Sequence, residues 1–419
     1  MSSDTHGAID AVWRIESPKL IAALTRVVRD IDVAEDLAHD ALVSALQQWP
    51  EAGIPRNPGA WLMAAAKHRA IDYFRRNKML DRKHEEIGND VRAVQASTPD
   101  FESALDDPVG DDLLRLIFTA CHPVLTTEAR VSLTLRLLGG LTTEEIARAF
   151  LSSEPTIAQR IVRAKKTLNK AQVPFEVPRG AELAARLASV LEVIYLIFNE
   201  GYAATAGADW VRPALCEEAL RLGRILAGLV PAEPEVHGLV ALMEIQASRL
   251  RARVGPTGEP ILLADQNRAQ WDQLLIRRGL TALQRADDLA GQNGPDVLQA
   301  SIAACHARAR TANGTDWARI AAVYERLADV VPSPVVELNR AVAVGMADGP
   351  AAALPIVERL ASVPAMQRYH LLPTVRGDLL FKLGRFDEAA HEFEHAAELT
   401  QNAREQQLLL DRARACAQT

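Results

Sequence analysis

The chain has 419 residues, of which 48% are hydrophobic and only 5% aromatic, and its formal net charge is −7. Its length predicts two to four domains, and its many alanine, leucine and arginine residues favour an all-α fold. The negative total excludes a uniformly basic nucleic-acid binder. Four widely separated cysteines, no zinc motif, no apolar run long enough to cross a bilayer and no signal-peptide pattern predict a cytoplasmic protein without a disulfide framework.

The first predicted helix covers residues 17–29. Ser17 is a suitable N-cap, and Pro18 suits the first turn, where its missing N–H would have no partner anyway. Leucine and valine then recur at helical spacing, which predicts one buried face.

The second predicted helix, residues 32–49, carries an acidic outer face. Asp32 and Glu35 have the spacing of a capping pair at its start. The apolar residues fall on one side of this helix, so the opposite side is free for a basic partner. That opposite side carries Glu35, Asp36, His39 and Asp40.

The third predicted helix, residues 59–77, interleaves basic and aromatic residues in WLMAAAKHRAIDYFRR. Basic residues are dense in and around it: Arg56, Lys67, Arg69, Arg75, Arg76, Lys78, Arg82 and Lys83. Phosphates require cations and unpaired bases require stacking surfaces, so the pattern is typical of a nucleic-acid contact. The alternative is an ordinary helix with aromatic core residues and solvated arginines. From the residues alone, Trp61 is assigned to the core, Lys67, Arg75 and Arg76 to phosphate contact, and His68 fits either interpretation.

The segment after this helix changes in character. Residues 81–110 contain several glycines and prolines, little periodicity and an excess of acidic side chains. This composition predicts a flexible acidic linker, although solvation alone is an equally sufficient reason for its charge.

Residues 141–168 are predicted to form a helix-turn-helix. Thr142 and Glu145 have the spacing of a capping box, and Ser153 followed by Pro155 predicts the start of a second helix. That second helix is apolar on one face and basic on the other, a shape and charge that suit the DNA major groove. An ordinary helical hairpin with a solvated basic face is the competing interpretation.

Together these three motifs resemble the extracytoplasmic-function group of bacterial RNA polymerase sigma factors. The segments AEDLAHDA and WLMAAAKHRAIDYFRR are similar to the group's two characteristic helices, and the helix-turn-helix follows in the same order. The resemblance covers residues 1–172. It implies a region 2 helical bundle at 1–80, a linker at 81–110 and a region 4 helix-turn-helix domain at 111–172.

The resemblance also implies partners and contact residues. Core RNA polymerase, through the clamp helices of its largest subunit, would bind Glu35, Asp36 and Asp40. The melted minus-ten strand would contact Trp61, Lys67, His68, Arg75 and Arg76. Double-stranded minus-thirty-five DNA would contact Ala158, Gln159, Arg160, Val162, Arg163, Lys165 and Lys166. His68 and Ala158 differ from the residues common in the group, so base choice at these two positions stays open.

Residues 173–419 form an extension that is predicted to be helical. Residues 377–399 match a tetratricopeptide-like (TPR-like) helix pair with Gly384 near the turn, and residues 340–360 resemble a degenerate earlier copy. Further helices are predicted at 191–202, 215–226, 234–253 and 262–273. The polar residues at 199–200 and 265–272 suit either a pocket lining or ordinary helix caps.

With this extension, the chain resembles the sigma-factor subgroup that carries a TPR-like C-terminal domain. In that subgroup the extension is thought to regulate the sigma core, and genes for small YCII-related (DGPF) proteins tend to lie nearby. We therefore expect a non-enzymatic initiation factor without cofactor or metal, in which residues 187–198 contact the sigma core. Cys121 and His122 are adjacent, and we expect them to pack at a helix end.

Two other functions are compatible with parts of the sequence. The first is a helix-turn-helix transcriptional regulator with a TPR-type sensor domain, although such a protein has no use for the second and third predicted helices. The second is an enzyme in residues 180–310, with Asp265, Asp272 or His306 as acid–base groups. That segment has no phosphate loop and no nucleophile-and-base spacing.

Overall fold

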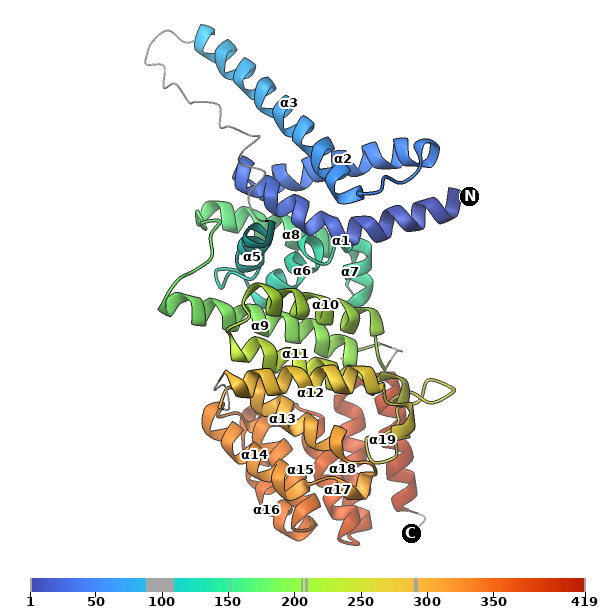
Figure 1. The fold of residues 1–419 in the computed structure, drawn as a ribbon. Coiled ribbons are helices and arrows are strands. Elements are labelled where there is room, and N and C mark those ends of the chain that lie inside the picture. The colour runs from blue at the N-terminus through green and yellow to red at the C-terminus, as the bar shows by residue number, and fades with distance from the viewer. Residues whose placement is uncertain are drawn as a thin grey trace. The chain divides into compact units, whose positions relative to one another are not determined.

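The structure is a computed structural model that describes residues 2–87, 109–150, 152–204, 206–207, 210–289 and 293–417. The chain divides into two compact units, Met1–Val193 and Ile194–Thr419. In the described residues both units are built from helices, and the strands form one two-residue pair (Figure 1). The prediction of an all-α fold is confirmed.

The first helix of unit 1, α1 (Ser2–Val28), starts earlier than expected. The predicted start at Ser17 and Pro18 is wrong, because Pro18 lies inside the helix. An interior proline removes one backbone hydrogen bond and tends to kink a helix. Buried side chains on either side of it, Ile9 and Leu20, hold the two halves of α1 in the core and favour its continuation.

The second helix, α2 (Ile31–Ala52), has a different cap from the one predicted. Asp30 is the N-cap, and its carboxylate accepts hydrogen bonds from the backbone N–H groups of Asp32 and Val33. The predicted capping pair Asp32 and Glu35 is therefore wrong. Since Asp30 satisfies the first N–H groups, the Glu35 carboxylate is available for contacts with other helices.

The third helix, α3 (Pro58–Ile87), starts where expected and runs further than expected. The side chain of Asn57 accepts a hydrogen bond from the N–H of Ala60, as an N-cap does. Residues 88–108, which make up most of the predicted linker, lie outside the described residues.

The remaining helices of unit 1 confirm the predicted helix-turn-helix. Their bounds are α5 (Val109–Ala120), α6 (Thr127–Leu137), α7 (Thr143–Ala149) and α8 (Glu154–Lys170). Thr142 and Glu145 form the complete capping box at the start of α7. Ser153 caps α8, and its hydroxyl accepts from the N–H of Thr156. The boundary between the two units falls within the next helix, α9 (Ala181–Tyr202).

Unit 2 is a succession of helices in which each packs against its neighbours in sequence (Figure 1). The helices are α10 (Pro213–Leu229), α11 (Pro234–Ala247), α12 (Gln273–Asp288), α13 (Pro295–Arg308), α14 (Trp317–Val330), α15 (Pro334–Ala347), α16 (Pro350–Ala361), α17 (Leu371–Lys382), α18 (Phe386–Leu399) and α19 (Ala403–Cys416).

The two predicted TPR-like helix pairs are present as α15–α16 and α17–α18. Gly384 lies in the turn of the second pair at a φ of 76°, which a residue with a side chain rarely adopts. A Cβ atom on Gly377 would lie 2.8 Å from the Phe393 ring, so this glycine allows α17 and α18 to approach closely.

The predicted helix at residues 262–273 is wrong. The connection from α11 to α12 is irregular, with short 3-10 turns at Leu250–Ala252 and Arg268–Gln270. Competition by side-chain oxygens for backbone donors explains the difference, because the side chain of Asn267 accepts from the N–H of Ala269. Asp272 likewise accepts from the N–H groups of Leu274 and Leu275, and so marks the true start of α12.

The only strands in the described residues tie the beginning of unit 2 to its end. β1 (Ala206–Gly207) pairs in parallel with β2 (Gln401–Asn402). Asn402 is 1% exposed, and its Nδ2 donates to the carbonyl oxygen of Ala204 at 3.0 Å. The segment that follows α9 is thereby fixed to the start of α19.

Candidate functional site

The second helix of the helix-turn-helix, α8, has the two faces that the sequence predicted. Its apolar residues Ile157, Ile161, Ala164 and Leu168 are buried. The amphipathic pattern therefore positions α8 in unit 1 and determines which residues point outward.

Most of the predicted DNA-contact residues lie on the outward face of α8. Gln159, Arg163 and Lys166 are exposed, and the side chain of Val162 is 47% exposed. Ala158 and Arg160 are half-buried. A helix with this mixed basic and apolar face has the shape and charge to enter a major groove.

Lys165 differs from these neighbours because it is only 7% exposed. Its ammonium donates to a Glu35 carboxylate oxygen at 2.5 Å and lies 2.8 Å from an Asp32 carboxylate oxygen. In this conformation Lys165 therefore neutralises the start of α2.

Glu35 is the centre of this contact and is 6% exposed. Besides Lys165, it accepts a hydrogen bond from Nε of Arg136 on α6 at 2.6 Å. Asp32, Glu35, Arg136 and Lys165 together are called the Glu35 cluster below. Two cations against one buried carboxylate and one half-exposed carboxylate balance the charge.

The protonation of the Glu35 cluster follows from these contacts. Burial alone would raise the pKa of Glu35, but the charges of Lys165 and Arg136 and the hydrogen bond from Lys165 lower that pKa below its ordinary value. Burial would lower the pKa of Lys165, and attraction to Glu35 and Asp32 raises it overall. Both groups are therefore charged at neutral pH, and each holds the other in its charged form.

The rest of the predicted acidic ridge on α2 remains accessible. Asp36 and Asp40 are exposed. His39, which lies between them and Glu35, is half-buried and approaches Nη2 of Arg136 at 3.2 Å. Burial and the nearby Arg136 lower the pKa of His39 despite the attraction of Glu35. The structure thus separates one buried carboxylate from two free ones on the same helix.

The predicted minus-ten residues lie along α3. Trp61 is half-buried, and its ring lies 5.3 Å from the ring of Trp49, which is fully buried. His68, Arg75 and Arg76 are exposed, and Lys67 is half-buried. Trp61 therefore takes part in packing, whereas His68, Arg75 and Arg76 face solvent.

Two further ion pairs join the helices of the N-terminal part to those of the helix-turn-helix part. Arg14 on α1 lies 2.5 Å from Glu145 at the start of α7. Arg26 on α1 pairs with Asp112 on α5 at 2.9 Å, and Asp112 is 2% exposed. Asp112 and Arg136 were not among the predicted site residues; the only signal for them was a lone charge on an otherwise apolar face.

The first half of α9 packs on the helix-turn-helix part within unit 1. Arg130 on α6 donates to the Ser189 hydroxyl at 2.5 Å and pairs with Glu192 at 2.9 Å. Ser189 donates to the carbonyl oxygen of Cys121, and Arg186 donates to that of Phe118. This set of contacts is called the α9 joint below, and it satisfies carbonyl groups at the end of α5.

Cys121 is part of this packing. Burial raises the pKa of its thiol to about 11, so the thiol stays protonated at neutral pH. Across the residues whose placement is described, no group of three or more His, Cys, Asp or Glu side chains is arranged to hold a metal ion. None of the described helices combines the length and apolarity needed to span a membrane.

Comparison with protein families identifies the two parts of unit 1. Residues 13–79 match Sigma-70 region 2, and residues 115–168 match Sigma-70, region 4. Residues 186–287 match a family of unknown function (DUF6596). A protein with these two sigma regions in this order is a DNA-binding transcription initiation factor of the sigma-70 class.

Among individual relatives, one matches nearly the whole chain and two carry sigma factor names. An uncharacterized protein of Rhizobium meliloti is 42% identical over 404 residues, which is 95% of this chain and 93% of its own length. A probable extracytoplasmic-function RNA polymerase sigma factor, SigI, of Mycobacterium tuberculosis is 26% identical over 41% of this chain and 58% of its own length. The RNA polymerase sigma-H factor of Pseudomonas aeruginosa is 28% identical over 38% of this chain and 82% of its own length. The chain belongs to the extracytoplasmic-function sigma factors and carries a C-terminal helical extension.

A double-mutant cycle should reveal the strength of the Glu35 cluster. Glu35→Gln or Lys165→Met alone should reduce the opening free energy of the α2–α8 contact by about 2–3 kcal/mol, because each leaves a buried charge with only one of its two partners. The double variant should lose less than the sum of the two. Hydrogen exchange of the amides in α2 and α8 measures this opening locally.

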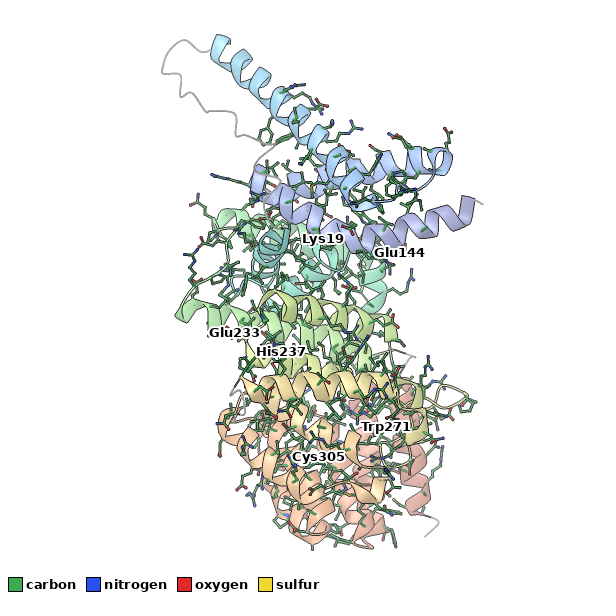
Figure 2. The ribbon with its side chains drawn as sticks, viewed as in Figure 1. Lys19, Glu144, Glu233, His237, Trp271 and Cys305 are labelled. Carbon is green, nitrogen blue, oxygen red and sulfur yellow. The ribbon has the colours of Figure 1, made fainter. Side chains whose placement is uncertain are left out.

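The matched control is the pair Glu144 and Arg148, whose side chains are 70% and 72% exposed. Glu144 can be located in Figure 2. Its coupling should stay below about 0.5 kcal/mol. Equal coupling in the two pairs contradicts the assignment of a strong Glu35 cluster.

The Glu35 cluster should also depend on pH. The contribution of Glu35 to the opening free energy of the α2–α8 contact should be complete above its ordinary pKa of 4.5 and disappear as pH falls through its lowered pKa.

Proposed function

We propose that this protein binds core RNA polymerase, directs promoter-specific transcription initiation, and is controlled by its own C-terminal extension. One observation carries the proposal. A region 2 helix with exposed carboxylates and a region 4 helix with an exposed basic face occur together on one chain, and the α9 joint fixes the start of the extension to α5 and α6 within unit 1.

Polymerase binding rests on Asp36 and Asp40. Both are exposed on one side of α2, where they can meet the basic clamp helices of the largest subunit. Complementary charge of this kind accelerates encounter and fixes orientation. Glu35 belongs to the same surface in the family, and it becomes available only when it separates from Arg136 and Lys165.

Promoter binding rests on α3 and α8. On α3, Lys67, Arg75 and Arg76 contact phosphate groups of the melted minus-ten strand. Trp61 and His68 belong to the same surface. On α8, Gln159 is placed to contact a minus-thirty-five base, with Ala158 and Val162 beside it. Arg160, Arg163 and Lys166 contact phosphate, and Lys165 joins them after the Glu35 cluster opens.

Control of activity follows from the use of the same residues for two purposes. Glu35 and Lys165 each belong to a proposed binding surface, and here they are bound to each other. We call the conformation in which Glu35 and Lys165 are bound to each other the closed conformation. A chain in this conformation offers incomplete surfaces to both polymerase and DNA. The α9 joint holds the first half of α9, where the extension begins, at α5 and α6, so this part of the extension is suited to stabilise the conformation. A functional link to YCII-related (DGPF) proteins stays a prediction of the family resemblance.

Run-off transcription with purified core polymerase tests the function directly. The full chain should support transcription from its promoter, and Asp36→Arg combined with Asp40→Arg should reduce co-purification with core at least tenfold, because like charges would then meet. Both residues are exposed, so the variant should fold normally. Undiminished association of the folded variant with core refutes the docking assignment.

The assignments on α8 predict two different effects on promoter binding. Gln159→Ala should change the preference at one minus-thirty-five base pair by about 1–3 kcal/mol. Arg163→Ala should weaken binding to all sequences about equally and reduce the salt dependence, because one counterion-releasing contact is lost. Binding measured at two salt concentrations on a set of single-base promoter variants separates them. A reversal of the two effects contradicts the assignment.

Disruption of the α9 joint should raise transcription. Ser189→Leu combined with Glu192→Lys removes contacts to Arg130 that contribute about 1–2 kcal/mol, so run-off yield should rise at least fivefold if the closed conformation limits activity. Glu176→Lys makes the same charge change at an exposed position before α9 and should leave the yield unchanged. Unchanged or reduced yield from a folded joint variant argues against control through this contact.

A further inference from the structure

Three arginines in the connection between α11 and α12 of unit 2 lie against aromatic rings. The Cζ atom of Arg253 lies 3.8 Å from the ring centroid of Tyr202 and 5.5 Å from that of Trp210. Arg249 lies 5.7 Å from both Tyr202 and Trp271. Arg268 lies 4.7 Å from Trp271. These six residues are called the arginine–aromatic cluster.

The arginines of this cluster have no carboxylate partner among the residues that the structure describes. Other arginines of unit 2 behave differently: Arg212 pairs with Glu200, Arg224 with Glu244 and Arg376 with Glu392. In the cluster, Arg249, Arg253 and Arg268 each keep a buried Nε without an acceptor in the described part of the chain. The positive charge is therefore left without a counter-charge.

The guanidinium groups nevertheless have defined positions. Nη1 of Arg268 donates to the carbonyl oxygens of His306 at 2.6 Å and Ala309 at 2.7 Å. Nη2 of Arg249 donates to the side-chain oxygen of Gln246, and Arg249 is only 6% exposed. A cation held rigidly next to rings is preorganised, because it loses little freedom when an anion binds.

Burial of these cations is unfavourable for the protein alone. Burial lowers the pKa of the Arg253 guanidinium, and the neighbouring Arg249 contributes to the decrease. Burial, with Arg249 and Arg268, also lowers the pKa of His306 to about 4, so this imidazole is neutral at neutral pH. Cation–π contacts offset only part of the free energy that burial of an ion costs. An anion would supply the missing compensation.

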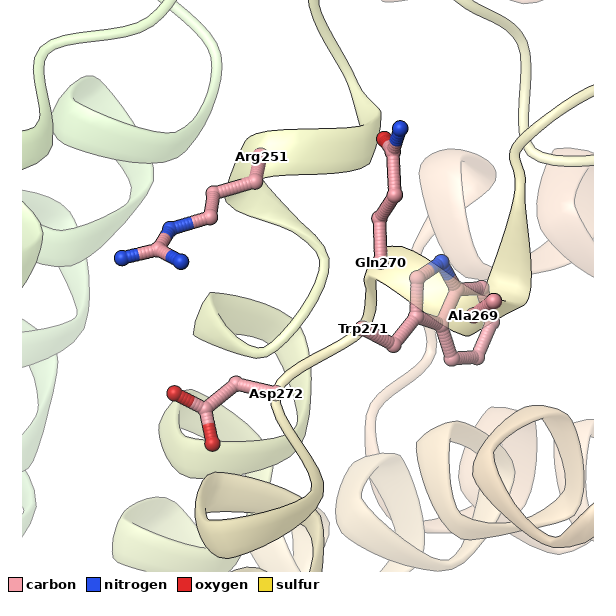
Figure 3. Close-up of a pocket in the computed structure, with 5 residues that line it drawn as sticks. All are labelled: Arg251, Ala269, Gln270, Trp271 and Asp272. Carbon is pink, nitrogen blue, oxygen red and sulfur yellow. The ribbon is translucent and has the colours of Figure 1, made fainter.

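A cavity of about 530 Å³ lies beside the cluster and is lined by Arg251, Ala269, Gln270, Trp271 and Asp272. Figure 3 shows Arg251 and Asp272 extending to one side of this loop and the Trp271 indole to the other. Trp271 belongs to both the cavity and the cluster, and its Nε1 is buried without an acceptor in the described residues. The volume is that of a small-molecule site.

We propose that the arginine–aromatic cluster and this cavity bind a small organic anion. The guanidinium groups suit a carboxylate, sulfonate or phosphate group, since their N–H groups form a planar fork that matches such oxygens. The indole and phenol rings hold these guanidinium groups in place. This site goes beyond the proposed transcription function and does not depend on it, because all of its residues lie in unit 2.

Two fluorescent probes test the site in the full-length protein. Anilinonaphthalene sulfonate combines an anionic group with planar rings, and phenylnaphthylamine has the same rings without the charge. The anionic probe should saturate one site per chain and bind at least tenfold more tightly than the neutral one. No saturable binding of the anionic probe, or equal affinity for both probes, overturns the proposal.

Three variants separate a binding role from a structural one. Arg249→Gln and Arg253→Gln should each weaken binding of the anionic probe at least tenfold, without lowering the melting temperature of the unliganded protein, because an uncompensated charge is removed. Arg277→Gln removes the same charge from an exposed position on α12 and should change neither quantity.

The role of the planar fork has its own variant. Arg253→Lys keeps the charge and should also bind the probe less tightly, which keeps the test decisive if the glutamine variants do not fold. Parent-like affinity of any of these folded arginine variants overturns the proposal, whatever its melting temperature.

Discussion

The buried ion pair between Glu35 and Lys165 determines what unit 1 can do. Each charge is removed from water, and each is stable only because the other, with Arg136 and Asp32, lies against it. Removal of one partner is costly, yet simultaneous separation returns both to water at little net cost. Substitution of either residue is therefore destabilising. Both residues can nevertheless exchange each other for new partners, a basic one for Glu35 and an acidic one for Lys165. In the proposed function, a basic polymerase surface and an anionic DNA backbone are two such partners.

Local sequence signals predicted local structure well in this chain. The capping box at Thr142 and the amphipathic pattern of α8 predicted the helix-turn-helix, and Gly384 predicted the turn of the last TPR-like pair. Errors occurred where several residues compete for one role. Asp30, and not Asp32 with Glu35, caps α2, and Asp272 caps the start of α12 within a segment that was predicted to be one helix. Pro18 remained inside α1 because tertiary packing outweighed a local preference.

For most of the candidate site residues, exposure was predictable from the sequence, but their arrangement and the burial of Glu35 and Lys165 were not. Periodicity placed Asp36, Asp40, Gln159 and Arg163 on outward faces, and the structure agrees on their exposure. Periodicity cannot show that Glu35 meets a lysine 130 positions away, because that contact depends on how whole helices pack. The arginine–aromatic cluster was equally hidden. Its members come from three separate segments, and their most informative property is the absence of carboxylates among the described neighbours.

The pairing of β1 with β2 changes how the extension acquires its structure. Linear helical arrays can form and lose their repeats one at a time, since each repeat contacts only its neighbours. Here Asn402 binds the carbonyl of Ala204 across 198 positions of sequence, so the first and last helices of unit 2 depend on each other. Contacts of such high sequence separation form late. During synthesis, the sigma regions are therefore complete well before the segment after α9 has its partner, and every newly made chain passes through a period in which its extension is unfinished.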